Sequence, residues 1–450
     1  MSPEEEKFQR MTTRPVGQLI CELAVPCIIS MMITAFYNLA DTFFVGMLHS
    51  NSATGAVGVA FSLMAIIQAV GFFFGHGSGN YMSRELGQQN HEEASKMAAT
   101  GFFLSLCTGG ILLVLGILFL KPLVLLLGST ETILPYATRY VRIILIGTPW
   151  MTTALTLNNQ LRFQGSAAYG MIGITAGGVL NIILDPILIF TCGLGISGAA
   201  LATIISQFIS FCILLRMTYR KGNIAILPAK TTLKVEYFSQ IIQGGLPSLF
   251  RQGLASLATI ALNRAAGLYG DAAIAAMAVV TRIMMMANSA LIGFGQGFQP
   301  VCGFNYGAKL WKRVRQGFLF CVKTSSSLLV LAAIGISIFA PQIVALFRND
   351  PTVIAIGAPA LRYQCITFAL GGLVVMSNMM LQTIGRTLPA TVLAVARQGI
   401  YLIPALWVLT PLLGLQGVQI AQPIADILSF LTALPISWSV LREMREDPVG

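Results

Sequence analysis

The chain has 450 residues, of which 55% are hydrophobic and only 10% are charged. Its mean hydropathy is +0.77, whereas a soluble domain carries roughly 25% charged residues, so a soluble enzyme or binding module is excluded. The net charge of +11 does not indicate nucleic-acid binding, because the basic residues lie in short clusters between apolar stretches. The positive-inside rule of membrane proteins produces this distribution.

Apolar stretches of about 20 residues, the length that crosses a ~30 Å hydrocarbon core, recur along the whole chain. In chain order they predict spans near residues 17–47, 54–78, 97–120, 133–156, 167–190 and 195–217, followed by 239–267, 272–298, 314–340, 353–380, 388–410 and 415–440. The pattern therefore predicts an all-α polytopic membrane protein with twelve transmembrane helices. Residues 1–15 begin with an acidic run, Glu4 to Glu6, and do not resemble a signal peptide, so the first span is expected to direct insertion.

Basic residues concentrate on one side of this topology. With the N-terminus in the cytoplasm, the cytoplasmic segments and span edges hold most of them, among them Lys7, Arg84, Arg162 and the basic stretch 216–234. The bias predicts that both termini are cytoplasmic. We expect a multi-pass protein of the cell (inner) membrane.

The two halves of the chain repeat one another. Gly75, Gly77, Gly87 and Gly165 recur at a constant offset as Gly295, Gly297, Gly307 and Gly385, and Pro26 has a counterpart in Pro247. The repeat predicts an N-terminal lobe (1–217), a cytoplasmic linker (218–238) and a C-terminal lobe (239–450), related by a pseudo-two-fold axis along the membrane normal with a cavity between them. The glycine-rich stretches 75–79 and 293–297 lack the Lys–Ser/Thr ending of a phosphate loop, so we interpret them as sites of close helix packing.

Acidic residues within the spans are the strongest functional signal. Asp41 and Asp185 lie in strongly apolar surroundings, and intramembrane carboxylates usually face a cavity and serve ion or substrate pathways. Asn181 and Asp185 are four residues apart and share a helix face. Asp41, Asp185 and Thr203 are predicted at similar depth, about 8–12 Å from the outer ends of their spans. Pro186 removes a helical hydrogen bond and frees a carbonyl group beside Asp185.

Four segments carry a resemblance to a known family: ADTFFVG (40–46), LRFQG (161–165), NIILDPILIF with GLGISGAALAT (within 181–203) and GFGQGFQPVCGFNYGAK (293–309). They resemble the multidrug and toxic compound extrusion (MATE) family over essentially the whole chain, and are most similar to its DinF-like branch. The resemblance implies two six-helix bundles that form a V around a central cleft. It also implies a secondary antiporter that extrudes cationic amphipathic drugs or toxins in exchange for protons or sodium.

The resemblance also implies a set of cation-coupling residues in the first lobe. By their motifs these are Asp41, Asp185, Asn181, Thr203, Ala199 through its carbonyl group and, with less support, Asn158, which lies nearer the cytoplasmic side. Another branch of the family carries acidic residues in its seventh and tenth helices. The corresponding segments here, LPSLFRQGLASLA and LGGLVVMSNMMLQ, contain none, so coupling through the second lobe is not expected.

Two coupling ions are compatible with these residues. Burial of a carboxyl group in general moves its titration toward neutral pH, which would let external protons load the cluster; we favour this reading. Alternatively, Asp41, Asn181, Asp185 and Thr203 with backbone carbonyls offer hard oxygen ligands for Na⁺. Pro26 is a candidate hinge through which loading bends the first helix, or a tolerated kink.

The remaining polar residues within spans have weaker assignments. Candidates for the substrate cleft, because polar groups in spans tend to face inward, are Tyr37, Asn38, Gln68, Asn288 and Gln382. Asp426 is expected to form a structural ion pair with Arg397, or alternatively to select substrates. The roles of Arg251 and Arg282 stay open.

No enzyme pattern is apparent in the sequence. The eight cysteines are scattered without CxxC spacing, the three histidines form no catalytic or metal motif, and there is no Walker motif, so we expect no enzyme activity and no cofactor beyond the coupling ion. Expected partners are cationic small molecules and membrane lipids, and the default oligomeric state is a monomer. The main alternative is a flippase for lipid-linked saccharides or other amphipathic anions; a metabolite exporter and a membrane scaffold are further alternatives.

Overall fold

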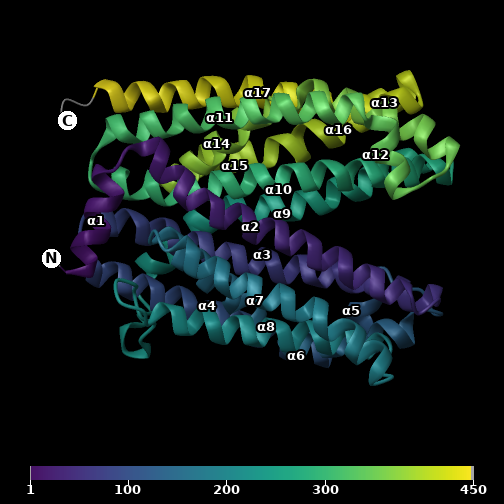
Figure 1. Cartoon of the computed structure of the whole chain (residues 1–450), viewed down its shortest axis with the longest axis horizontal. Helices are drawn as coiled ribbons and strands as arrows, with labels where there is room; N and C mark the ends of the chain where they lie inside the picture. The colour runs from purple at the N-terminus through teal and green to yellow at the C-terminus, as the bar shows by residue number, and fades with distance from the viewer. Residues whose placement is uncertain (1, 447–450) are drawn as a thin grey trace.

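The computed structural model describes residues 2–446, and within them all regular structure is helical (Figure 1). One bundle contains α2 (Val16–Gly46), α3 (Asn51–Gly87), α4 (His91–Leu118), α6 (Leu134–Phe163), α7 (Ala167–Pro186) with the π-helical turn η1 (Ile187–Thr191), and α8 (Ile196–Thr218). The other contains α9 (Val235–Gly267), α10 (Asp271–Gly307), α11 (Trp311–Ile338), α13 (Pro351–Phe368) with α14 (Gly371–Thr383), α15 (Thr387–Val395) continued through η3 (Ala396–Leu402) into α16 (Ile403–Leu413), and α17 (Leu415–Glu446). Short helices are α1 (Pro3–Thr13), α5 (Leu120–Leu126), α12 (Ala340–Phe347) and the 3₁₀ turn η2 (Pro228–Lys230).

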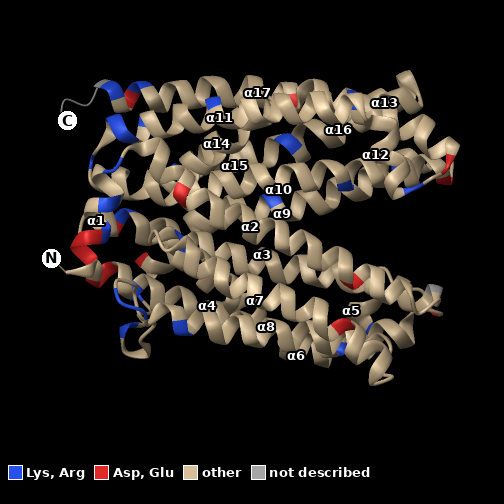
Figure 2. Ribbon diagram, viewed as in Figure 1, with Lys and Arg blue, Asp and Glu red and all other residues tan. Residues whose placement is uncertain are grey.

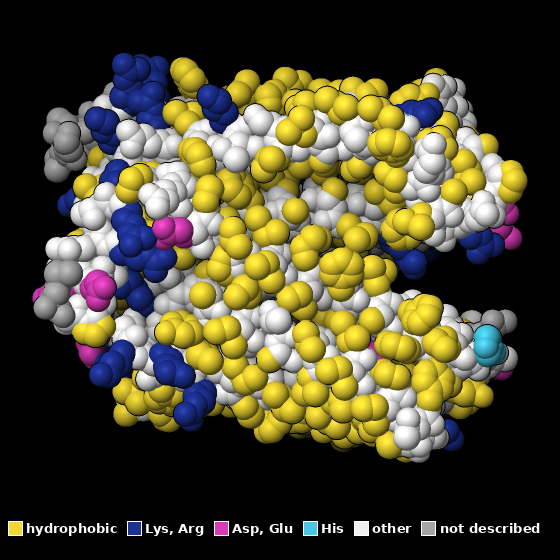
Figure 3. Space-filling view, in the orientation of Figure 1, with side chains coloured by type: hydrophobic (Ala, Val, Ile, Leu, Met, Phe, Trp, Pro, Cys, Tyr) yellow, Lys and Arg dark blue, Asp and Glu magenta, His cyan; other side chains and the backbone are white. Residues whose placement is uncertain are grey.

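The predicted twelve-span architecture is confirmed. Nine helices in the described part of the chain are long and apolar enough to cross a membrane, and α13 with α14 forms a tenth span bent by 55°. The other two, α6 and α9, have 30 and 33 residues, enough at 1.5 Å per residue to cross a bilayer, but they carry several arginines. Hydrophobic side chains cover most of the middle of the face seen in Figure 3, between the two ends at which charged residues gather.

The two bundles meet at the end of the molecule that holds both termini and separate at the other, where Figure 3 shows a hollow between them. Glycines permit this meeting, because the helices cross almost backbone to backbone. A Cβ atom on Gly297 of α10 would lie 2.4 Å from Cα of Ala24 in α2, and one on Gly245 of α9 would lie 2.3 Å from the carbonyl oxygen of Phe73 in α3. Close packing, rather than phosphate binding, explains the glycine-rich repeats.

Gly297→Val is therefore expected to open or destabilise this junction. A branched side chain there meets backbone, which cannot move aside as a side chain can, and such overpacking typically costs about 1–3 kcal/mol. The expected result is a lower melting temperature and increased labelling of the buried thiol of Cys302, in a background lacking the exposed cysteines. Gly253→Val in α9 is the matched control, because nothing lies within 4 Å of a Cβ added there. Equal behaviour of the two variants would contradict the prediction.

The N-terminal helix α1 lies across the joined end of both bundles. On the side of the first bundle, Lys7 Nζ donates to Ser166 Oγ at 2.9 Å, to the Gly222 carbonyl at 2.5 Å and to Asn223 Oδ1 at 2.9 Å. On the side of the second, Asn305 Nδ2 of α10 donates to the Met11 carbonyl at 3.0 Å. A capping box between Ser2 and Glu5 starts the helix. Lys and Arg gather around this end (Figure 2), and α1 connects the two bundles there.

Docking of α1 is expected to strengthen as pH rises. Burial, reinforced by the charge of Arg10, lowers the pKa of Lys7 from 10.5 to about 8. Between these two values the detached helix binds more protons than the docked one, so docking gains free energy with rising pH; below pH 8 the penalty for the charged amine is fully present. A spin label at exposed position 9 should lose mobility between pH 8 and 10 in the wild type. In Lys7→Met the same label should show no such change, and identical profiles would contradict the assignment.

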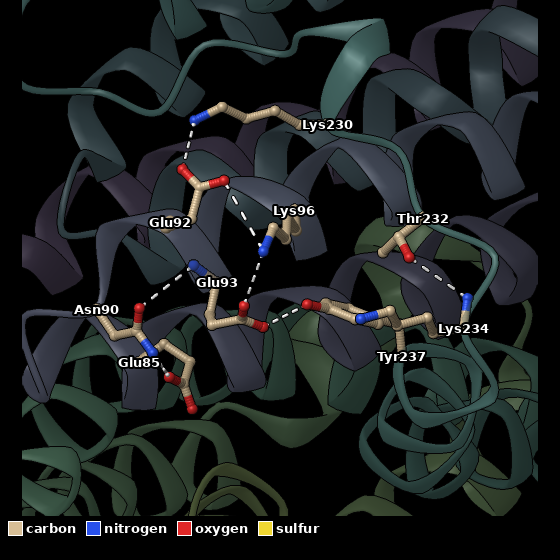
Figure 4. Close-up of polar contacts among 9 residues, drawn as sticks. All are labelled: Glu85, Asn90, Glu92, Glu93, Lys96, Lys230, Thr232, Lys234 and Tyr237. Atoms are coloured by element: carbon tan, nitrogen blue, oxygen red, sulfur yellow. Dashed lines mark hydrogen bonds and ion pairs between the residues drawn. The ribbon is translucent and has the colours of Figure 1, made fainter.

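The segment between α8 and α9 is anchored to the first bundle (Figure 4). Lys230 forms an ion pair with Glu92 at 3.2 Å. Glu93 accepts a hydrogen bond from the Tyr237 hydroxyl of α9 and pairs with Lys96 at 3.1 Å. The connection therefore holds the start of the second bundle against α4.

Candidate functional site

Asp185 is a buried carboxyl group without a hydrogen-bond partner among the described residues. Its relative exposure is 0%, and neither Oδ1 nor Oδ2 is bonded within residues 2–446. The residue lies at the end of α7, where Pro186 interrupts the helix and the chain continues as the π-helical turn η1. A buried carboxylate without partners is strongly disfavoured, so this position is suited to bind a proton or a cation.

The turn after η1 brings α8 back against α7. Gly193 and Gly195 adopt positive φ angles of 67° and 56°, which glycine reaches without steric cost, and Gly198 packs directly against the Leu188 carbonyl. As a result Asn181 of α7 faces Thr203 of α8, with Asn181 Nδ2 3.5 Å from Thr203 Oγ1. Thr203 in turn donates to the Ala199 carbonyl at 3.1 Å.

The first helix, α2, completes this cluster. Gly178 of α7 leaves room for Ile33 and Tyr37, because a Cβ at position 178 would lie 2.7 Å from Ile33 Cγ2. Asp41 follows Tyr37 by one turn, on the same face, and its Oδ1 is buried and unpaired within the described residues. Tyr140 of α6 is also buried, with 4% of its surface exposed. Its hydroxyl group lies beside Thr203 and close enough to Asp41 and Asp185 to interact with their charges.

The predicted coupling residues Asp41, Asn181, Asp185, Thr203 and Ala199 are thus brought together, with Tyr140 as a member that sequence reasoning missed. Asp41, Asn181 and Asp185 each have a buried side-chain oxygen without a hydrogen-bond partner among the described residues. Hard cations prefer such carboxylate, amide and carbonyl oxygens. The donor set fits Na⁺ and equally fits protonation of the carboxyl groups.

A small cavity of about 40 Å³ lies one helical turn from Asp41. It is lined by Tyr37 and Gln68, two of the predicted cleft residues, together with Thr34, Met64, Gln207 and Ser210 among others. A site of this size accommodates a few water molecules. The cavity lies inside the first bundle, next to the carboxyl cluster.

Four other predicted residues belong neither to this cluster nor to the lining of the cavity. Asn158 packs against Gly170, about 22 Å along α7 from Asp185 at 1.5 Å per residue, and is therefore separate from the cluster. Gln382 does not line the cleft: it is 1% exposed and donates to the Gly244 carbonyl and to Ser248 Oγ, both at 2.7 Å. Asn38 and Asn288 are half-buried.

Asp426 lies beside Arg397, the ion-pair partner predicted for it from the sequence. Arg397 Nε donates to Asp426 Oδ1 at 2.7 Å. Gln422 Nε2 donates to the same oxygen at 2.9 Å, and Thr367 approaches Oδ2 at 3.4 Å. This carboxylate is satisfied by neighbours of its own bundle, in contrast to Asp185.

A buried polar network between the bundles was not foreseen from the sequence. Arg162, assigned from the sequence to the cytoplasmic segments and span edges, is 2% exposed. It donates to Gln299 Oε1 at 2.8 Å and to the Gln296 carbonyl at 3.0 Å, both in α10, and to Asn159 Oδ1 at 2.6 Å. His76 of α3 extends the network, with Nε2 3.2 Å from Arg162 and Nδ1 3.1 Å from Ser248 Oγ of α9.

Comparison with known proteins agrees with this architecture. The model of the MatE family matches residues 26–187 and again 247–408, so the two matches begin at Pro26 and Pro247. The chain is 25% identical over 445 residues to the multidrug export protein MepA of Staphylococcus aureus (strain MRSA252), covering 99% of this chain and 98% of that protein.

Solved structures extend the likeness to three dimensions. The outward-facing conformation of a multidrug resistance MATE family transporter of the MOP superfamily superimposes with a TM-score of 0.92 at 25% identity, covering 97% of this chain and 98% of that one. A MATE in the bent conformation gives a TM-score of 0.91 at 25% identity, covering 98% of each chain.

Proposed function

The chain belongs to the MatE family of multidrug efflux transporters, and from this premise we propose that it is a secondary antiporter that exports cationic amphipathic compounds in exchange for protons or sodium. The observation that carries the proposal is the buried cluster of unpaired oxygens at Asp41, Asp185 and Asn181. Protons or Na⁺ bound there supply the charge that the site lacks. We favour protons as the coupling ion.

Transport proceeds by alternating access between the lobes 1–217 and 239–450, joined by the linker 218–238. With both termini in the cytoplasm of the cell membrane, as the basic residues at that end favour (Figure 2), the hollow in Figure 3 faces outward. Pro26 lies inside α2, the helix that carries Asp41, and a proline removes one helical hydrogen bond. Loading of the cluster bends α2 at this hinge; the similar protein solved in a bent conformation supports the idea.

The transporter acts as a monomer, and exported compounds enter the cleft between its two lobes. The positive charge of the compound competes with the coupling ion for the carboxyl groups. Tyr37 and Gln68 supply an aromatic ring and an amide at the adjoining cavity. The ring and the amide suit the cationic group at one end of such a compound, through cation–π attraction and hydrogen bonding.

The function is tested in inverted membrane vesicles with a fluorescent cation such as ethidium added outside, on the cytoplasmic face, so that export carries the dye into the vesicles. Wild-type protein should drive dye transport when a proton gradient or a sodium gradient is imposed, and the effective gradient identifies the coupling ion. An ionophore that collapses that gradient should stop transport. Dye that stays in place under both gradients contradicts antiport and favours a flippase for lipid-linked saccharides, which leaves the dye unmoved.

A further inference from the structure

The long helix α2 begins inside the core of the second bundle. Leu19, Ile20 and Leu23 are at most 3% exposed and belong to the same buried core as residues of α10, α11 and α13. A Cβ atom added at Gly293 of α10 would lie 2.7 Å from Cα of Ile28. The first part of α2 is therefore packed as a member of the second bundle, although by sequence it belongs to the first.

Beyond Pro26, α2 changes its partner. A Cβ atom at Gly178 of α7, in the first bundle, would lie 2.7 Å from Ile33 Cγ2 and 3.7 Å from Cδ1 of Tyr37. Figure 1 shows α2 running obliquely from one bundle to the other. The crossing falls between Ile28 and Ile33, directly after the proline.

The helix α9 makes the reverse crossing. Ile241 is buried in a core with residues of α3, α4 and α6 of the first bundle, and a Cβ atom at Gly77 of α3 would clash with its carbonyl group. Further along α9, Leu254 packs on η3 of the second bundle, where a Cβ atom at Gly399 would lie 3.3 Å from its Cδ1. Pro247 lies inside α9 between these two regions of contact.

Each crossing thus contains a proline. A proline removes one hydrogen bond of the helix ladder and is a usual site of a sharp bend. A helix whose two ends are packed into different bodies has to bend when these bodies move apart, and the bend falls at its weakest point. Pro26 and Pro247 hold equivalent places in the internal repeat, since each begins one match to the family model.

We propose that α2 and α9 exchange their first halves between the two bodies that move during transport, with Pro26 and Pro247 as paired hinges. One body comprises residues 27–246, and the other comprises residues 2–25 together with 248–446. The inference rests on the proposed alternating access and replaces the division at the linker by a division at the two prolines.

This division identifies the bonds that break when the joined end opens. The helix α1 precedes the first half of α2 and moves with the second bundle, so Lys7 has to leave Ser166 Oγ, to which it donates at 2.9 Å. Arg84 Nη1 at the end of α3 has to leave the Thr383 carbonyl of α14, which lies 2.6 Å away. The bonds of Arg162 to α10 break as well, whereas the contacts of the first half of α2 with α10 and α11 persist.

Two cysteine pairs test this division, because both connect the two halves of the sequence at the joined end. Val16→Cys with Gly317→Cys connects α2 to α11, where a Cβ atom at Gly317 would lie 3.1 Å from Val16 Cγ1. Ser83→Cys with Thr383→Cys connects α3 to α14, since both side chains border Gly303. Each pair is placed in a background lacking the exposed cysteines and is joined by the same short thiol-reactive crosslinker.

Ethidium transport into inverted vesicles is compared before and after crosslinking. The crosslinked pair at positions 16 and 317 should retain at least half of its rate, because both positions lie in one body. The crosslinked pair at positions 83 and 383 should fall below a tenth, because these positions separate. Moving bodies that coincide with the sequence halves predict that both crosslinks block transport. Blockage by the first crosslink, or tolerance of the second, would overturn the inference.

Pro247→Ala tests the second hinge without cysteines. Alanine restores the missing helical hydrogen bond and stiffens α9, so the maximal rate of dye transport should fall at least threefold. The dye concentration that gives half of this rate, and the melting temperature, should not decrease. Pro435→Ala is the matched control, because α17 lies in one body over its whole length.

A maximal rate of Pro247→Ala equal to that of the wild type would contradict the paired hinges. The wild type in the same vesicles reads the efflux function separately. Dye transport by the wild type combined with blockage by the 16–317 crosslink defeats this inference alone. Absence of dye transport by the wild type defeats the proposed function, and the inference with it.

Discussion

Asp185→Asn is expected to reduce gradient-driven dye transport to the level of empty vesicles. The substitution keeps the shape of the side chain but removes the group that binds a proton or balances a cation. Because neither oxygen of Asp185 is bonded within the described residues, the carboxylate has no structural partner whose loss would explain the effect. The measurement is the initial rate of ethidium transport under the effective gradient, normalised to protein in the vesicle membrane.

Asp41→Asn should behave similarly, since Asp41 Oδ1 is also buried and unpaired in the part of the chain that the structure covers. Asp271→Asn is the matched control, because Asp271 lies at the exposed start of α10. Melting temperatures of all three variants should stay close to that of the wild type. Transport that persists in both Asp185→Asn and Asp41→Asn would refute coupling through the first bundle and direct attention to Asp426.

The acidic cluster could be predicted from the sequence because its signal is local. A carboxylate in an apolar span is conspicuous whatever its neighbours, and the spacing of Asn181 and Asp185 places both on one helix face. Tyr140 could not be found this way, since a tyrosine in an apolar span has no unusual local feature. Its place beside Thr203 depends on how α6 packs against α8.

The polar network between the bundles escaped prediction for a related reason. Arg162 stands at the end of a span, where the positive-inside rule makes an arginine ordinary. Gln382 carries the same local signal as a cleft residue, a polar group in an apolar span, yet it is bonded to Ser248. Which polar groups face a cleft and which face another helix is decided by tertiary packing.

Helix boundaries, too, are predicted where a local sequence signal exists and are missed where tertiary packing decides them. The apolar stretches predict the long spans, but α1, α5 and α12 are too short or too polar for a hydropathy signal of their own. The bend of 55° between α13 and α14 lies at the break just before Gly371 and Gly372, and neither this break nor its angle has a hydropathy signal. The π-helical turn after Pro186 is consistent with the carbonyl group that the proline is predicted to free. The length of this turn depends on how α8 packs against it.

Arg162→Met is expected to destabilise the protein and to loosen the joined end of the two bundles. Methionine keeps much of the side-chain volume but leaves Gln299 Oε1, Asn159 Oδ1 and the Gln296 carbonyl without their donor. Leaving a buried hydrogen-bond acceptor without its donor costs about 1–3 kcal/mol. Arg162→Lys should recover only part of this, because a single ammonium group does not reproduce the planar fork that reaches both α10 and Asn159.

Two measurements separate this bridging role from a general packing role. Melting temperature in detergent reports stability, and maleimide labelling of Cys302, which is 0% exposed in α10, reports opening of the joined end once the exposed cysteines Cys21, Cys107, Cys192 and Cys212 are replaced. Arg162→Met should lower the melting temperature and accelerate the labelling of Cys302. Arg362→Met, at a solvent-exposed position, should change neither quantity. A fall in melting temperature without faster labelling would show that Arg162 stabilises its own bundle but does not hold the two together. Because two of its bonds cross from α6 to α10, we expect both effects together, and with them a shift away from the outward-open arrangement.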